Sequence, residues 1–180
     1  FLFVQLPGFM DYNYLPWESQ WAEFREAQAE SLSLSNTGMA VAIDIGEWND
    51  IHPDNKKPVG ERLALAAEKI AYGENIVYSG PTYQSQTIQG NKIIISFTNT
   101  GSGLTTNDGE VLSEFAIAGD DKKFFWAHAV IDGNKIIVSS DEVTTPKYVR
   151  YAWADDPVNP NLINKEARPD GSVGQGLPAA

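Results

Sequence analysis

The sequence predicts an α/β segment followed by an all-β segment, because two different hydrophobic patterns meet near residue 75. Before that point, short uninterrupted apolar runs alternate with a helical period of apolar residues, as in the strands and helices of a parallel-sheet protein. After it, short apolar runs are separated by turn residues, as in an all-β fold. We therefore expect two domains, residues 1–74 and residues 75–180, of which the second is a β sandwich with a loop-rich tail from residue 154.

The α/β part should begin with a strand and a helix. Residues 1–6 form a short apolar run bounded by Pro7 and Gly8, which is typical of a strand covered on both faces. A helix is expected from Trp17 to about Glu30, with charged residues on its outer face. Its apolar stripe would consist of Trp17, Trp21, Phe24 and Ala27.

A second strand and a second helix complete this pattern. Residues 38–45 form another apolar run, and a helix from about Pro58 to Tyr72 follows, with Gly73 placed to end it. The order strand, helix, strand, with a crossover of this length, indicates a parallel pair. The polar loop of residues 46–56 therefore lies at the carboxyl end of a parallel strand, where open α/β sheets bind their ligands.

Six β-type runs and two similar hairpins are expected after this helix. Segments 88–97 and 131–140 resemble each other, and each carries a Gly-Asn pair where a tight hairpin needs a positive φ. Two copies are too few to indicate a repeat architecture, so both hairpins are assigned to one sandwich. The six runs are residues 75–80, 92–99, 114–119, 123–131, 135–140 and 148–153.

The composition argues against several functions. The 180 residues include 24 acidic and 13 basic side chains, and the formal charge of -11 argues against nucleic acids and anionic membranes as partners. The chain has no cysteine, so disulfides and thiolate metal sites are excluded. No apolar run approaches the roughly 20 residues that span a bilayer. The chain starts without methionine, inside a predicted strand, which suggests a cleaved protein or a fragment.

His52 is the better of two histidine candidates for catalysis. It lies in the loop after the second strand, two residues beyond Asp50, so in extended backbone the two side chains project to the same side. A carboxylate beside an imidazole can fix its tautomer and stabilise the imidazolium. Taken alone, such a pair in a polar loop is more often a solvated surface feature. His128 lies in an alternating run and is interpreted as structural or exposed.

Metal binding by the same loop is a weaker interpretation. One imidazole without a thiolate makes a poor zinc site. Calcium in the acidic loop, or in the segment of residues 155–161, is an alternative, and an ordinary acidic surface is another.

Several strings of the sequence resemble one enzyme family. The segment TGMAVAIDIGEWNDIHPDNKKPVGERLALAA resembles the stretch of sialate O-acetylesterases and related bacterial carbohydrate esterases that holds their catalytic histidine. The strings FLFVQL, REAQ, YSGP, VRYAW, NLIN and GLPA follow the order that this family shows. The resemblance therefore covers almost the whole chain.

This resemblance implies a fold and two site residues. The fold is the C-terminal part of an SGNH-type, flavodoxin-like three-layer hydrolase domain, followed by the β sandwich. His52 would be the general base and Asp50 the carboxylate that orients it. Many SGNH hydrolases carry this aspartate three residues before the histidine, where Asn49 stands in this chain.

The serine nucleophile is expected on another segment. No Gly-Asp-Ser element follows a strand near the start, and Ser19, Ser33 and Ser35 lie in or just after the first predicted helix. An N-terminal segment of the same gene product, or a separate chain, would supply the serine and the remaining strands. The resemblance implies no cofactor and a secreted or periplasmic protein, and the lack of cysteine favours a bacterial source.

The expected activity is removal of acetyl groups from sialic acid or related sugars by a serine-histidine-aspartate mechanism. Few cations are placed to hold a sialic acid carboxylate, namely Lys56, Arg62 and Arg150, so an acetylated polysaccharide such as xylan is the alternative substrate. A non-catalytic carbohydrate-binding module, in which the β sandwich binds sugar and the histidine loop is inert, is an alternative of another class. A structural subunit of a catalytic partner is a third.

Overall fold

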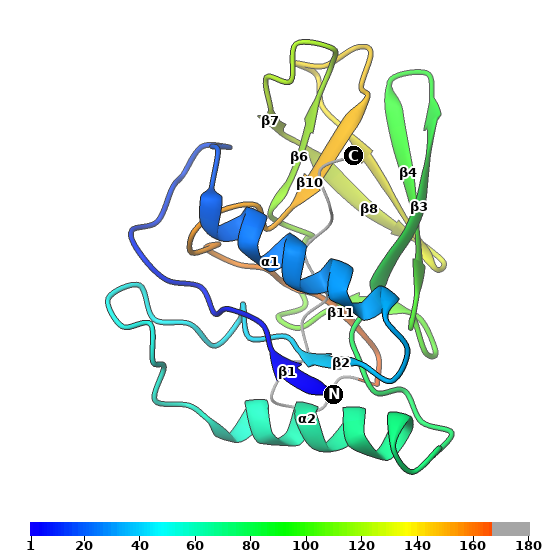
Figure 1. The fold of residues 1–180 in the computed structure, drawn as a ribbon. Coiled ribbons are helices and arrows are strands. Elements are labelled where there is room, and N and C mark those ends of the chain that lie inside the picture. The colour runs from blue at the N-terminus through cyan, green and yellow to red at the C-terminus, as the bar shows by residue number, and fades with distance from the viewer. Residues whose placement is uncertain (167–180) are drawn as a thin grey trace.

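A two-stranded parallel sheet flanked by helices forms the first part of the protein, whose residues 1–166 are described by a computed structural model (Figure 1). Strand β1 (Leu2–Val4) pairs in parallel with β2 (Gly38–Ala40). Between them lie α1 (Gln20–Glu30) and the 3-10 turn η1 (Ser31–Ser33), and α2 (Lys57–Ile70) follows β2. Figure 1 shows α1 on one side of this sheet and α2 on the other. The predicted parallel pair is present.

Helix α1 starts later than expected and buries another face. Its N-cap is Ser19, whose hydroxyl accepts a hydrogen bond from the Ala22 amide at 2.9 Å, so the predicted start at Trp17 is wrong. The buried positions are Ala22 and Arg25, whereas Phe24 of the predicted stripe is 60% exposed. The apolar stripe therefore does not cover the core of the described structure.

The arginine in α1 explains which face turns inward. The guanidinium of Arg25 donates to the carbonyls of Ala152, Ala154 and Asp155, with distances of 3.3 Å to Ala152 and 3.2 Å to Asp155. Buried carbonyl oxygens need donors, and one guanidinium serves three of them. Because burial disfavours its charge, the pKa of Arg25 is lowered to about 10, and nearby carboxylates oppose that shift.

Helix α2 matches its prediction closely. It begins with Pro58 in its first turn, and Gly73, at φ +75°, follows its end. Gly38 of β2 lets the helix approach the strand, since a Cβ there would lie 2.6 Å from Ile70 Cδ1 and 3.2 Å from Ala66 Cβ. The helix thus fixes the strand that leads into the histidine loop.

The remaining strands are antiparallel. A four-stranded sheet has the order β3-β4-β9-β8, a three-stranded sheet the order β10-β6-β7, and β11 pairs with β5. The two expected hairpins are confirmed: β3 turns into β4 at Gly90 and β8 into β9 at Gly133, both at positive φ. Their bounds are β3 Thr82–Gln89, β4 Lys92–Thr98, β5 Leu104–Thr106, β6 Phe115–Ala118, β7 Phe125–Trp126, β8 His128–Asp132, β9 Lys135–Ser139, β10 Tyr148–Tyr151 and β11 Leu162–Asn164.

One hydrophobic cluster joins the two parts of the chain. Met39, Val41 and Ile43, in and after β2, belong to the same buried cluster as Ile95 of β4 and Tyr151 of β10. The change near residue 75 thus separates two kinds of secondary structure that share a core. The division into two domains stays a prediction.

The segment after residue 154 was expected to be a loop-rich tail. Its described part, residues 154–166, lies in loops and turns apart from β11, which is buried throughout. The rest of that expectation, and the string GLPA, lie outside the described residues. Within residues 1–166, no helix is both long and apolar enough to cross a bilayer.

Candidate active site

The loop after β2 is held in place by hydrogen bonds to its own backbone and to the loop after β1. The Asp50 amide donates to the Glu47 carbonyl at 3.1 Å, and a Glu47 carboxylate oxygen accepts from the Asp54 amide at 2.8 Å. The Met10 amide donates to the Trp48 carbonyl at 2.9 Å. Both loops leave the carboxyl ends of parallel strands, so they lie where such sheets bind ligands.

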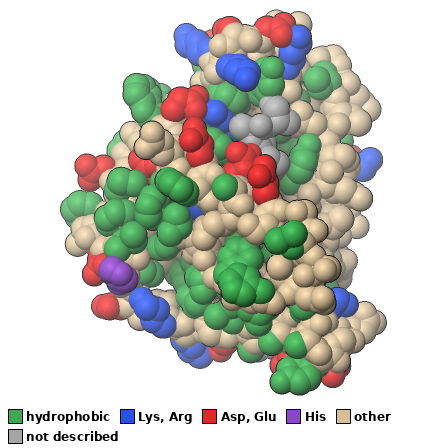
Figure 2. Space-filling model, in the orientation of Figure 1, with side chains coloured by type: hydrophobic (Ala, Val, Ile, Leu, Met, Phe, Trp, Pro, Cys, Tyr) green, Lys and Arg blue, Asp and Glu red, His purple; other side chains and the backbone are tan. Residues whose placement is uncertain are grey.

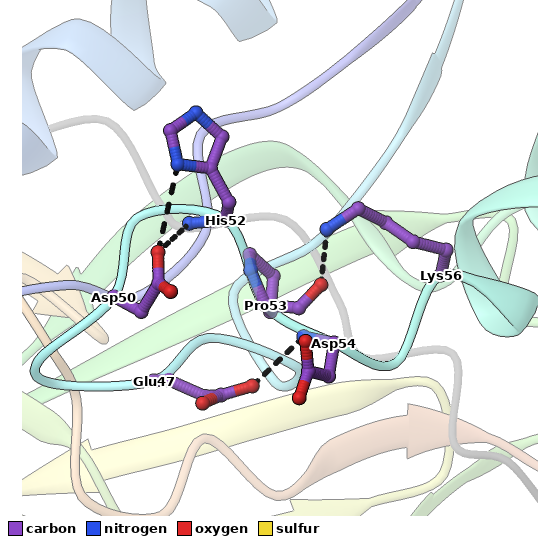
Figure 3. A network of polar contacts seen from close by, with 6 residues as sticks. All are labelled: Glu47, Asp50, His52, Pro53, Asp54 and Lys56. Carbon is purple, nitrogen blue, oxygen red and sulfur yellow. Dashed lines mark hydrogen bonds and ion pairs between the residues drawn. The ribbon is translucent and has the colours of Figure 1, made fainter.

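Asp50 and His52 lie together at the surface of this loop (Figure 3). An Asp50 carboxylate oxygen accepts a hydrogen bond from the His52 backbone amide at 2.7 Å. The same oxygen lies 3.5 Å from Nδ1 of the His52 ring. The side chains are 85% and 56% exposed for His52 and Asp50 respectively. Figure 3 shows Nδ1 facing Asp50 and the second ring nitrogen pointing away from it. This arrangement leaves Nε2 open to a reacting group.

The separation of 3.5 Å is longer than a strong hydrogen bond. Catalytic hydrogen bonds are often long without substrate and tighten in the reacting complex. The geometry therefore suits an imidazole whose tautomer a carboxylate can fix, and the roles of His52 and Asp50 stay predictions.

A buried ion pair supports the base of the loop. Arg62 of α2 donates from its two terminal nitrogens to the two carboxylate oxygens of Asp44, at 2.7 and 2.6 Å, and also to the Val41 carbonyl at 2.6 Å. From the sequence, Arg62 was expected among the cations that could hold a sialic acid carboxylate. The pairing of Arg62 with Asp44 assigns both to positioning β2 and its loop, because a bidentate pair fixes orientation as well as distance.

Residues 155 and 156 contact the loop after β1 and the start of α1. The Phe9 amide donates to the Asp155 carbonyl at 3.2 Å, and an Asp155 carboxylate oxygen accepts from the Ser19 hydroxyl at 2.5 Å. A Cβ on Gly8 would lie 2.2 Å from an Asp156 carboxylate oxygen, so the Asp156 side chain would have to move. The β part of the chain therefore supports the loop after β1, which sequence reasoning missed because these contacts span more than 100 residues.

Asp156 lines a polar pocket of about 230 Å³ beside this junction. Asp156 is buried, and one of its carboxylate oxygens has no hydrogen-bond partner within the described residues. Burial raises the pKa of Asp156 to about 6, against the opposing effects of the Arg25 charge and the Tyr12 hydroxyl. Within residues 1–166, no three His, Asp or Glu side chains are grouped so that they could hold a metal ion.

The structure separates the serines and the second histidine from His52. Ser19 is buried as the helix cap, whereas Ser33 and Ser35 precede the amino end of β2 and His52 follows its carboxyl end. His128 lies on β8, exposed and opposite Ser139 in the four-stranded sheet. His52 is therefore the histidine at the ligand-binding edge of the parallel strands.

Comparison with solved structures shows a carbohydrate acetylesterase from Xanthomonas citri with the same fold. The two share 44% of residues over 98% of this chain and 40% of that one, with a TM-score of 0.88. Among curated proteins, the sialate O-acetylesterase of Mus musculus is 39% identical over 45% of this chain, and that of Homo sapiens is 36% identical over 69%. The chain is related to the sialate O-acetylesterases. No family model matches it.

The relation to sialate O-acetylesterases confirms the resemblance expected from the sequence. The chain spans only part of these relatives, because its matched regions cover 17% of the mouse protein and 25% of the human one. The similarity to these relatives therefore concerns a part of their length.

Proposed function

We propose that the chain is part of a carbohydrate O-acetylesterase in which His52 is the general base. The observation that carries this proposal is the position of His52 beside Asp50, exposed at the carboxyl end of β2. The relation to a carbohydrate acetylesterase and to sialate O-acetylesterases gives the reaction class.

The proposed reaction is acyl transfer in two steps. A serine hydroxyl attacks the acetyl carbonyl carbon while Nε2 of His52 takes its proton, and the tetrahedral intermediate collapses as the imidazolium returns that proton to the leaving sugar oxygen. Water then attacks the acetyl-serine with the same ring as base, which releases acetate and the serine. Asp50, near Nδ1, holds the neutral tautomer and stabilises the imidazolium.

The serine would come from a preceding segment or a separate chain that completes an SGNH-type three-layer domain. Two observations support this. Among the described residues, β2 is the strand that pairs with β1, and the other edge of β1 carries no strand. A further parallel strand on that edge would replace the Gln28 side chain, which donates to the Val4 carbonyl at 3.2 Å and accepts from the Leu6 amide at 2.9 Å. Large apolar side chains, including Phe1 and Phe24, are exposed next to that edge and on α1. An added strand would pair with β1 and cover these side chains.

The proposed substrate is an acetylated sugar, either sialic acid or a related one, with acetylated xylan as the alternative. Arg62 was one of the cations expected to hold a sialic acid carboxylate, but it is buried and paired with Asp44. Lys56 donates to the Pro53 carbonyl beside His52 and is the cation of this loop (Figure 3). Export from the cytoplasm stays a prediction from the family resemblance.

The test compares the two histidines in protein that contains the serine-bearing segment. His52→Ala should lower kcat/KM for 4-nitrophenyl acetate by about 10³-fold or more, as loss of a general base does. His128→Ala is the matched control and should leave it unchanged, because this exposed histidine lies on β8. A fluorophosphonate that labels serine nucleophiles should mark a peptide outside this chain. Equal activity of the two variants, or a label on Ser19, Ser33 or Ser35, would contradict the proposal.

A further inference from the structure

A pocket of about 520 Å³ lies between the segment before α1 and the region of β7. Its volume is within the range of about 300–1,000 Å³ that is usual for small-molecule sites. It is lined by residues 15–18, residues 122–126 and Arg150, which are brought together from distant parts of the sequence. The pocket is separate from the polar pocket at Asp156 and from the loop that carries His52.

Two tryptophans give this pocket ring surfaces. Trp126 donates its indole N–H to the Tyr14 carbonyl at 2.9 Å, which fixes the orientation of a residue that stays 39% exposed. Trp17, on the opposite segment, is 67% exposed. The face of a pyranose ring that carries C–H groups can lie on such aromatic faces, because the C–H groups are apolar and the ring quadrupole attracts their partial positive charge.

A fixed charge pair forms the polar part of the wall. Arg150 donates to both carboxylate oxygens of Glu18, at 3.0 and 2.9 Å, and its guanidinium lies over the rings of Phe124, at 3.9 Å, and Trp153, at 4.5 Å. Each carboxylate oxygen of Glu18 has two acceptor sites, so it can accept further hydrogen bonds from hydroxyl groups. The pair thus places a carboxylate that is 67% exposed beside the aromatic faces.

These observations favour a sugar over an apolar protein segment as occupant. An apolar segment would bury the Glu18–Arg150 pair without replacing the water that it loses, which is costly. The ammonium groups of Lys122 and Lys123 lie over the rings of Tyr148 and Phe125, so their charges too are held at this pocket. A sugar supplies both an apolar ring face and hydroxyl groups for the charged side chains.

We propose that this pocket is a carbohydrate subsite that binds a pyranose ring on Trp126 and Trp17, with Glu18 accepting hydrogen bonds from its hydroxyl groups. The choice of a carbohydrate rests on the proposed function of the chain as part of a carbohydrate esterase. The subsite would hold part of the sugar chain away from the acetyl group that reacts. Its role is binding, and it needs no nucleophile.

The experiment titrates purified protein that contains the serine-bearing segment with xylotriose and, separately, with the methyl glycoside of N-acetylneuraminic acid, by tryptophan fluorescence and calorimetry. At least one sugar should bind with a Kd of about 10 mM or tighter. Trp126→Ala should weaken that binding about tenfold or more, and Trp126→Phe, which keeps a ring face, should weaken it less. Val130→Ala is the matched control, because Val130 is an exposed apolar residue of neighbouring β8 outside the pocket.

The outcomes separate this inference from the proposed esterase activity. Absence of binding by either sugar, or equal binding by the wild type and Trp126→Ala, would overturn the subsite. Circular dichroism of each variant identifies unfolding, and in that case Trp126→Phe and Glu18→Gln supply the comparison. Sugar binding that depends on Trp126 while His52→Ala leaves hydrolysis unchanged would retain the subsite and reject the proposed catalytic base.

Discussion

The two parts of the chain differ in how completely they bury their own apolar residues. Of the sixteen large hydrophobic residues that are exposed in the described structure, eleven lie in residues 1–74 and five in residues 75–166. Figure 2 shows hydrophobic side chains gathered on the face where α1, β1 and their adjoining loops lie. The β part therefore leaves few large apolar side chains exposed, whereas the α/β part leaves many of them at the surface.

The largest expected effect comes from breaking the buried ion pair of the α/β part. Arg62→Ala should lower the free energy of unfolding by about 3–5 kcal/mol, because it leaves the Asp44 carboxylate buried without its cation. Urea denaturation measures the change. Asp44→Ala combined with Arg62→Ala should cost less than the sum of the single changes. Additive losses would show that the pair does not couple β2 to α2.

In the β part, removing a single hydroxyl should cost less. Tyr151→Phe leaves the buried Leu162 amide without the acceptor that it has at 2.9 Å, and should lower the free energy of unfolding by about 1–3 kcal/mol. Hydrogen exchange of the Leu162 amide locates the effect. Unchanged protection at Leu162 would mean that another acceptor replaces the hydroxyl.

Asp156, where the two parts meet, should give a stability change that depends on pH. Its folded-state pKa of about 6 lies above the usual carboxyl value of 3.8, so the charged form is disfavoured in the fold. The loss of stability caused by charging Asp156 is absent below the unfolded pKa, grows as the pH rises, and is complete above about pH 6. Asp156→Asn should therefore raise stability by about 1–2 kcal/mol at pH 7.5 and leave it unchanged at pH 3.5. Thermal unfolding at both pH values measures this, and an equal gain at both would contradict the titration.

The smallest effect expected in the chain alone is at the exposed surface of α1. Phe24→Ser should change the free energy of unfolding by less than about 0.5 kcal/mol, since this side chain packs little in the described structure. In a protein that includes the serine-bearing segment, the same change should be clearly destabilising. Parallel denaturation of the two forms tests the comparison directly. Equal effects in both would show that α1 stays uncovered.

Local patterns determined much of the architecture. The hairpins at Gly90 and Gly133 and the end of α2 before Gly73 depend on residues close in sequence, whose backbone preferences act without distant partners. The approach of Asp50 to His52 is local in the same sense, because they are two positions apart and the Asp50 carboxylate accepts a hydrogen bond from the His52 amide. These features could be predicted from the chain itself.

Distant contacts decided the rest. Hydrophobic periodicity predicted that an apolar face of α1 would be buried. In the structure Arg25 is buried because it donates to carbonyls within residues 152–155, and Phe24 is exposed. The short strands β5 and β11 form only because residues 104–106 and 162–164 meet across the fold. The sequence alone determined the strand-helix-strand-helix order of residues 1–74 and the histidine with its carboxylate, since those depend on neighbours along the chain. The strand expected at residues 75–80 is wrong, because no strand forms there. Tertiary structure decided which charges pair, which apolar faces stay exposed and how the β part supports the loop after β1. These features depend on contacts between residues that are far apart in the sequence.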